Sequence, residues 1–119
     1  MTNFEIDYAL AVAIGWSEKS DDPDVQVFDP SSRWTARVVV WHAEKWQTFS
    51  HKDPAVIFPI ATRLGIFPDA IVSGNLRATH SEIVGWECNA WSYKRKRWVH
   101  VEADTAATAI ALAVIESLK

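Results

Sequence analysis

The chain has 119 residues, of which 49% are hydrophobic and 23% charged, and its formal net charge is −3. These values predict one globular domain over residues 1–119 and argue against a largely disordered chain. The acidic balance also argues against general nucleic-acid binding through a basic field. The unusual feature is the set of seven tryptophans, because an excess of Trp is typical of a dense core or a binding surface.

The predicted elements alternate helices with short strands, on the basis of capping residues, helical stripes and β-branched or aromatic runs. Predicted helices run from Thr2 or Asn3 to about Ile14, from Ser50 or Asp53 to Gly65, and from a cap at Asp104 to Leu118. Predicted strands are 25–28, 34–41, 46–49 and the two arms of a hairpin within 85–104.

Three details of these elements can be checked against a structure. Pro59 lies inside the second predicted helix and removes one backbone hydrogen bond, so we expect a kink or a later start there. The turn residues in 66–74 predict a short helical turn that leads into a connector. The last helix has one apolar stripe, which consists of Ala107, Ile110, Ala111, Val114 and Leu118.

The order of the elements predicts an α+β fold. We expect an α-β-α layered sandwich with a small, mainly antiparallel sheet of about four strands and three main helices. Two of the predicted helices and the strand at 34–41 are apolar on more than one side. We therefore expect either helices on both faces of the sheet or a homo-oligomer, dimeric or larger, that buries the surplus apolar surface.

The hairpin within Gly85–Asp104 is central to the functional prediction. We expect Arg95 and Lys96 to form a two-residue turn, which pairs Tyr93 with Trp98. Strand alternation then places Trp86, Cys88, Ala90, Val99 and Val101 on one face. The other face carries Glu87, Asn89, Trp91, Tyr93, Trp98, His100 and Glu102. A core face is thus expected to back a face of large aromatic side chains.

The candidate binding residues combine aromatic rings with cations. They are Trp91, Tyr93, Arg95, Arg97, Trp98 and His100 in the hairpin, with Arg33, Trp34 and Arg37 earlier in the chain. Indole rings stack on bases and guanidinium groups bind phosphate in a fork, so this set suits a small anionic nucleotide. The same residue types form protein-binding hot spots. A third interpretation is that a helix covers the aromatic rings and that the cations form an ordinary exposed turn.

The sequence offers no complete motif for catalysis or metal binding. Each histidine is followed two positions later by an acid, in the pairs His42/Glu44, His51/Asp53, His80/Glu82 and His100/Glu102. Such a pair shares a face on a strand, but a catalytic zinc needs a third ligand. The glycines stand singly and form no phosphate cradle, and Cys88 is expected to be a buried, inert thiol. We therefore expect no enzyme activity, no catalytic residue, no metal and no cofactor.

Four stretches carry a resemblance to a known family. They are Ile6–Trp16, Phe49–Ala55 with Ile60 and Leu64-Gly65, Trp86–Cys88, and Ala103–Ala106 with Ala109–Ala113. Together they resemble the phage ABA sandwich domain family, which consists of small proteins of phage and prophage genomes. The resemblance implies an α-β-α architecture and a phage origin, and it brings no established catalytic residues.

These observations lead to three functional hypotheses. The first is a non-enzymatic phage accessory protein of the anti-defence type that sequesters a small nucleotide-type signalling ligand as a homo-oligomer. The second is a protein–protein inhibitor of a host defence or replication factor, and the third is a small hydrolase with an unrecognised site. We expect the cytoplasm of the host cell as the location, because the N-terminus lacks signal-peptide features and the longest apolar run, Tyr8–Ile14, is too short to span a bilayer.

Overall fold

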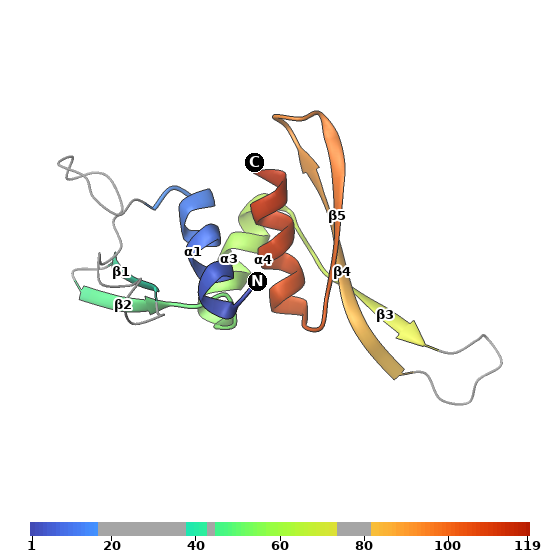
Figure 1. The fold of residues 1–119 in the computed structure, drawn as a ribbon, viewed down its shortest axis with the longest axis horizontal. Helices are drawn as coiled ribbons and strands as arrows, with labels where there is room; N and C mark the ends of the chain where they lie inside the picture. Colours follow the sequence, from blue (N-terminus) through green and yellow to red (C-terminus); the bar gives the residue numbers. More distant parts are fainter. Residues whose placement is uncertain (17–37, 43–44, 74–81) are drawn as a thin grey trace.

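The computed structural model describes residues 1–16, 38–42, 45–73 and 82–119, and these form three helices and five strands (Figure 1). In chain order the elements are α1 (Asn3–Ala13), β1 (Val38–His42), β2 (Lys45–Phe49), α3 (Pro54–Leu64), β3 (Asp69–Ser73), β4 (Glu82–Ser92), β5 (Arg97–Ala103) and α4 (Ala106–Ser117). The predicted strand at 25–28 and the first part of the one at 34–41 lie outside the described residues. None of the described helices is long and apolar enough to cross a membrane.

The described strands form two separate antiparallel sheets. β1 pairs with β2, while β3, β4 and β5 form a second sheet in that order. The helices lie between the two sheets (Figure 1). The α+β class, with three main helices and antiparallel strands, is therefore confirmed. The strands are divided between two small sheets instead of being joined in one, and the helices form the layer that separates them.

Helix α4 is the centre of the packing. It contacts α1 and α3 on one side and β4 and β5 on the other (Figure 1). Ile110 and Val114 of the predicted stripe are buried, but Ala109 and Ile115 outside the stripe are buried as well. Leu118, which belonged to the stripe, is 46% exposed. The single stripe was too narrow a prediction, because a helix enclosed on two sides buries apolar residues on more than one face.

The two ends of α1 follow their sequence signals. The Thr2 hydroxyl accepts the Glu5 amide at 3.1 Å and the Glu5 carboxylate accepts the Thr2 amide at 3.2 Å, which is a capping box. Gly15 follows the helix with φ +106°, a conformation that favours glycine. The amide of Trp16 then donates to the Ala11 carbonyl at 2.9 Å, and the Trp16 side chain is buried.

Helix α3 also begins and ends where the sequence predicts. Asp53 is the N-cap and accepts the Ala55 amide at 3.0 Å, Pro54 is the first helical residue, and Gly65 ends the helix with φ +67°. Pro59 lies inside α3, so the expected later start is not observed. A proline removes only one hydrogen bond from the helical ladder, and the helix continues through it.

Residues 69–73 form the strand β3, where we predicted a helical turn and a connector. Ala70 lies opposite Trp86 of β4, and Val72 lies opposite Ile83. The β-branched side chains of this segment favour a strand, but the flanking turn residues outweighed that signal in the prediction. A short strand is stabilised by packing and pairing with its neighbour, which local sequence does not show.

The turn between β4 and β5 is longer than we predicted. Trp98 pairs with Trp91 and not, as we had predicted, with Tyr93. Residues 93–96 therefore form a four-residue turn. Lys96 has φ +54°, and left-handed residues are common in turns of this length. The register differs from the prediction by two residues. Because strand side chains alternate with a period of two, each side chain keeps its predicted face.

Candidate binding site

β4 and β5 present a candidate binding surface on the side of the sheet that faces away from α4. This outer face consists of three cross-strand pairs: Trp91 opposite Trp98, Asn89 opposite His100, and Glu87 opposite Glu102. Directly opposite side chains in an antiparallel pair point to the same side. Between them, Cys88, Ala90 and Val99 point inward and are buried, so the predicted division into a core face and an aromatic face is confirmed.

The aromatic residues of the outer face and of the adjoining turn are open to solvent. Trp98 is 67% exposed, Trp91 36% and Tyr93 84%. The rings of Trp91 and Trp98 meet edge to face, with centroids 5.5 Å apart and planes at 71°, an arrangement that stabilises aromatic pairs. These exposures rule out the interpretation that a helix covers the rings.

A pocket of about 330 Å³ opens beside the tryptophan pair. The hairpin contributes Trp91, Tyr93, Lys94 and Trp98 to its lining, and the C-terminal ends of α3 and α4 with the residues after them contribute Leu64, Ile66 and Leu118. This volume lies at the lower end of the range for small-molecule sites, about 300–1,000 Å³. Three aromatic rings and one lysine suit a planar ligand that carries a negative charge.

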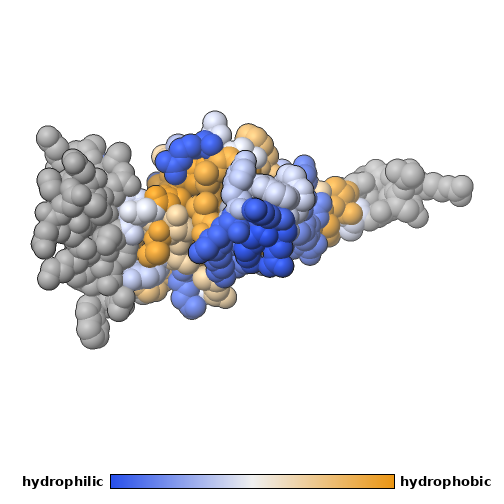
Figure 2. Space-filling model, turned by 90° about the horizontal axis from the view of Figure 1, so that it is seen from above, coloured by the Kyte–Doolittle hydropathy of each residue, from blue (hydrophilic) through white to orange (hydrophobic). Residues whose placement is uncertain are grey.

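Cations gather at the tip of the hairpin. Lys94, Lys96 and Arg97 are exposed. Figure 2 looks onto the side that is at the top of Figure 1, where the hairpin tip lies, and shows a hydrophilic patch near the middle of the view beside more hydrophobic surface. Arg95 differs from them, because its guanidinium donates a hydrogen bond to the Glu116 carbonyl near the end of α4. A cation at the C-terminal end of a helix is favoured by the helix dipole. Arg95 thus anchors the turn to α4.

The structure brings six of the predicted binding residues together on one hairpin. They are Trp91, Tyr93, Arg95, Arg97, Trp98 and His100. The remaining three, Arg33, Trp34 and Arg37, lie outside the described residues.

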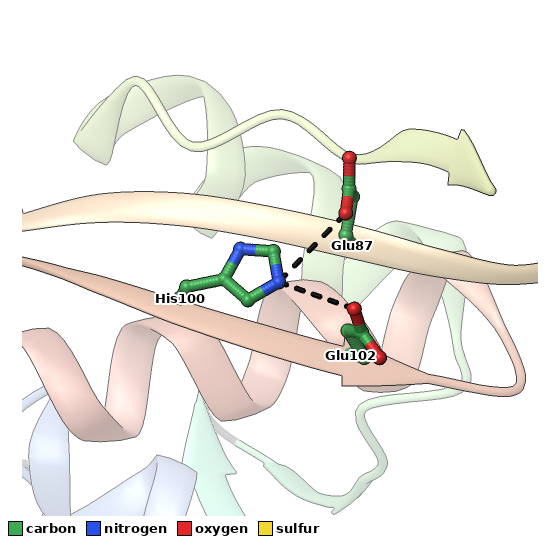
Figure 3. Close-up of side chains that lie close together, drawn as sticks. All are labelled: Glu87, His100 and Glu102. Carbon is green, nitrogen blue, oxygen red and sulfur yellow. Dashed lines mark hydrogen bonds and ion pairs between the residues drawn. The ribbon is translucent and has the colours of Figure 1, made fainter.

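His100 lies between two carboxylates on the outer face (Figure 3). Its Nε2 atom is 3.3 Å from Glu102 Oε1 and 3.7 Å from Glu87 Oε2. Its Nδ1 atom is 2.9 Å from Asn89 Oδ1. His100 and Glu102 share a strand face as predicted, while Glu87 reaches the histidine from the neighbouring strand. Sequence reasoning missed Glu87, because the cross-strand partner depends on the length of the turn.

A second histidine network lies inside the helical layer and was also missed. Asp7 Oδ1 accepts hydrogen bonds from the His51 amide at 2.7 Å and from His51 Nδ1 at 2.6 Å. His51 Nε2 is 3.1 Å from the Thr108 hydroxyl oxygen. The network joins α1, the segment before α3, and α4. His51 is fully buried, so its hydrogen bonds tie these three segments together inside the fold, although the three groups stand in the order of a catalytic triad.

Cys88 is fully buried on the inner face of the hairpin. Burial raises the pKa of the Cys88 thiol from 9.0 to about 11, and the negative charge of Asp69 adds to this shift. Only the thiolate is a good nucleophile, and this thiol is protonated at neutral pH. The predicted burial of the thiol is confirmed, and the raised pKa agrees with the low reactivity that we expect.

Another pocket, of about 390 Å³, lies between the end of α1, β2 and α3. Its lining includes Asp53 and Arg63 together with the aromatic residues Trp16 and Phe49. Both aromatic side chains are buried in the core, so this pocket lacks the exposed ring faces that the hairpin offers. The hairpin is the better candidate for a stacked ligand.

Comparisons with known proteins leave the function to be argued from the geometry. No protein-family model, no curated protein and no solved structure matches the chain. The resemblance to the phage ABA sandwich domain family therefore stays a prediction.

Proposed function

We propose that this chain is a non-enzymatic phage accessory protein that sequesters a small nucleotide-type signalling ligand on the β4–β5 hairpin. The exposed Trp91–Trp98 pair beside a pocket is the observation that carries this proposal. The inner face of β4 and β5 packs against α4. This packing fixes the strands that carry the two tryptophans, so the rings are in place before a ligand binds. Such preorganisation lowers the entropy cost of binding. The phage origin rests on the sequence resemblance.

The hairpin residues divide into a stacking part and a phosphate-binding part. A base that stacks on Trp98 would gain about 1–3 kcal/mol of binding free energy. Lys94 lines the same pocket and can donate charge-assisted hydrogen bonds to phosphate oxygens. The pocket volume suits one base with its sugar, so we expect a mononucleotide or one half of a dinucleotide to bind there.

A nucleotide panel tests this proposal. Linear mononucleotides, cyclic mononucleotides and cyclic dinucleotides are added singly while tryptophan fluorescence and the melting temperature are measured. One member should change the fluorescence and raise the melting temperature by several degrees, because a ligand at 100 times its Kd contributes about 2.7 kcal/mol to the free energy of unfolding. A flat response to every member would contradict nucleotide sequestration.

A matched pair of tryptophan variants locates the ligand. Trp98→Ala should weaken binding about 10- to 100-fold through the loss of stacking. Trp46 lies in β2 of the other sheet and is 49% exposed, so Trp46→Phe should leave the affinity unchanged. Equal losses in both variants would place the ligand elsewhere than on the outer face.

The edge of β5 favours a second candidate function, a protein–protein inhibitor of a host defence or replication factor. Among the described strands β5 pairs with β4 alone, and a strand edge can accept a partner strand through backbone hydrogen bonds. A groove of about 540 Å³ borders this strand and α4, and its lining includes Arg95, Arg97, Val99, Leu112 and Glu116. An extended segment of a partner protein would fit this groove.

Co-purification distinguishes this candidate from nucleotide sequestration. The wild-type protein should retain one host protein from a lysate, and Arg97→Ala and Trp98→Ala should lose it while Trp46→Phe retains it. Recovery of no specific protein would count against an inhibitor. Loss of the partner in all three variants would show that the hairpin is not the contact surface.

We also propose that the protein acts as a homo-oligomer. Val12 is 49% exposed and Leu118 46% exposed, and both line a shallow apolar hollow with Tyr8 and Ile115. Phe58 adds exposed apolar surface on α3. Patches of this kind are typical of contacts between subunits. Light scattering should therefore give a mass above that of one chain at micromolar concentration, and a monomer would contradict the proposal.

A further inference from the structure

We propose that Glu87, His100 and Glu102 form a binding site for a divalent transition-metal ion, with Zn²⁺ as the best fit. The three side chains converge on the outer face from two neighbouring strands (Figure 3). The site is separate from the aromatic pocket, whose lining contains none of these three residues. The metal proposal therefore does not rest on nucleotide binding.

The separation of the ligand atoms matches a metal centre. Zn–N and Zn–O bonds of about 2.0–2.2 Å at tetrahedral angles place neighbouring ligand atoms about 3.3–3.6 Å apart. His100 Nε2 lies 3.3 Å from a Glu102 oxygen and 3.7 Å from a Glu87 oxygen. The three ligand atoms all lie within 4.8 Å of one another, so small rotations of the carboxylates complete the geometry.

Asn89 orients the imidazole for coordination. Its Oδ1 atom accepts a hydrogen bond from His100 Nδ1 at 2.9 Å. In the neutral ring this leaves the lone pair of Nε2 directed at the two carboxylates, which is unfavourable unless a cation or a proton lies between them. Metal-binding histidines usually donate their second ring N–H to such an acceptor.

The placement of the two carboxylates gives an independent reason for a cation. Glu87 lies directly opposite Glu102 in the sheet, and like charges in directly opposite positions destabilise an antiparallel pair. A divalent cation between them replaces repulsion with attraction. The side chains of Glu87, His100 and Glu102 are 35%, 48% and 64% exposed, so an ion reaches them from solvent.

The ligand types identify the class of ion. One imidazole nitrogen with two carboxylate oxygens suits Zn²⁺, Mn²⁺ or Fe²⁺, whereas Ca²⁺ and Mg²⁺ favour oxygen ligands only. Zn²⁺ binds nitrogen and oxygen sites more tightly than Mn²⁺ or Fe²⁺. Three protein ligands leave one position open, and it lies on the same strand face as Trp98. An oxygen atom of a bound ligand can occupy that position.

Calorimetric titration of the tag-free protein with Zn²⁺ tests the site. We expect one Zn²⁺ per chain, with no binding of Mg²⁺ under the same conditions. His100→Ala and Glu102→Gln should each weaken Zn²⁺ binding at least 100-fold. Glu116→Gln is the matched control, since Glu116 lies on α4 beside Arg95 and Lys119, and it should leave the affinity unchanged.

Asn89 variants separate a positioning role from a structural one. Asn89→Leu keeps all three ligands but removes the acceptor for Nδ1, so Zn²⁺ affinity should fall about 10- to 100-fold. Asn89→Asp keeps an acceptor and should restore the affinity. Melting temperatures without metal should be similar for both variants, because the side chain is exposed.

Two results would overturn the metal site, and a third would overturn the role given to Asn89. The first is the lack of any Zn²⁺ binding at millimolar concentration. The second is Zn²⁺ binding that survives His100→Ala unchanged, which places the ion elsewhere in the chain. The third is an equal affinity in the Asn89→Leu and Asn89→Asp variants, which removes the orienting role of the amide.

Discussion

His51 and His100 are each followed two residues later by an acid, yet the two histidines have different partners. His100 lies on a strand, where Glu102 points to the same side and comes within 3.3 Å of the ring. His51 lies before a helix, where Asp53 serves as the N-cap of α3. The ring of His51 contacts Asp7, 44 residues earlier in the chain. The same spacing brings two side chains together only where the backbone is extended.

Burial separates the two clusters further. The buried Asp7–His51 pair joins α1 to the segment before α3, and His51 also contacts Thr108 of α4, so the network holds these segments together. The cluster around His100 lies on an open sheet face. Its contacts between the imidazole and the carboxylates contribute little to stability, but an ion can reach these side chains from solvent. One histidine therefore serves the fold, and the other is available for binding.

The largest expected effect comes from breaking the buried cluster. His51→Ala leaves Asp7 without its imidazole partner and should lower the free energy of unfolding by about 3–5 kcal/mol, as measured by urea denaturation. Lys52→Ala is the neighbouring control and should change stability by less than about 0.5 kcal/mol. A loss below about 1 kcal/mol in His51→Ala would show that the network does not hold the helices together.

A smaller effect is expected at the start of α4, beside the buried cluster. The Thr105 hydroxyl accepts the Thr108 amide at 3.2 Å and donates to the Thr108 hydroxyl at 2.9 Å. Thr105→Ala should therefore cost about 1–2 kcal/mol, and Thr105→Ser should recover most of it. Thermal denaturation measures both changes. A larger loss in Asp104→Ala than in Thr105→Ala would favour the cap that the sequence predicted.

The exposed cluster should respond much less in the metal-free protein. His100→Ala removes two contacts with carboxylates that are exposed to solvent, so the free energy of unfolding should fall by less than about 1 kcal/mol. Urea denaturation in the presence of a chelator measures this value. A loss as large as that of His51→Ala would show that the outer face is structural, and it would weaken both binding proposals.

The smallest effect at neutral pH concerns Cys88, on the buried side of the strand that carries Glu87. The unfolded thiol ionises near pH 9, while the folded thiol, with a pKa of about 11, keeps its proton. The unfolded chain binds fewer protons in this window, so stability should fall as the pH rises from 9 to 11. In Cys88→Ala that slope should be shallower. Identical slopes in urea denaturation would show that the thiol ionises alike in both states.

Much of the secondary structure could be predicted from local signals. Thr2 caps the start of α1, and Gly15 and Gly65 stand at the ends of α1 and α3, as expected, because capping depends on residues within one turn. The faces of the hairpin were also predictable even though the turn was two residues longer, since a shift of two residues keeps every side chain on its side. β3 was missed, because its strand conformation depends on pairing with β4.

The candidate site divides in the same way. The aromatic and cationic residues of the hairpin were found from composition and alternation within twenty residues of chain. Their exposure was decided only by the tertiary structure, which packs α4 against the inner face and leaves the outer face open. Glu87 beside His100 depends on the cross-strand register, and Asp7 beside His51 depends on the packing of helices distant in sequence. The local sequence thus determined which residues can form a site. Long-range packing decided which of these residues contact one another and which are exposed to solvent.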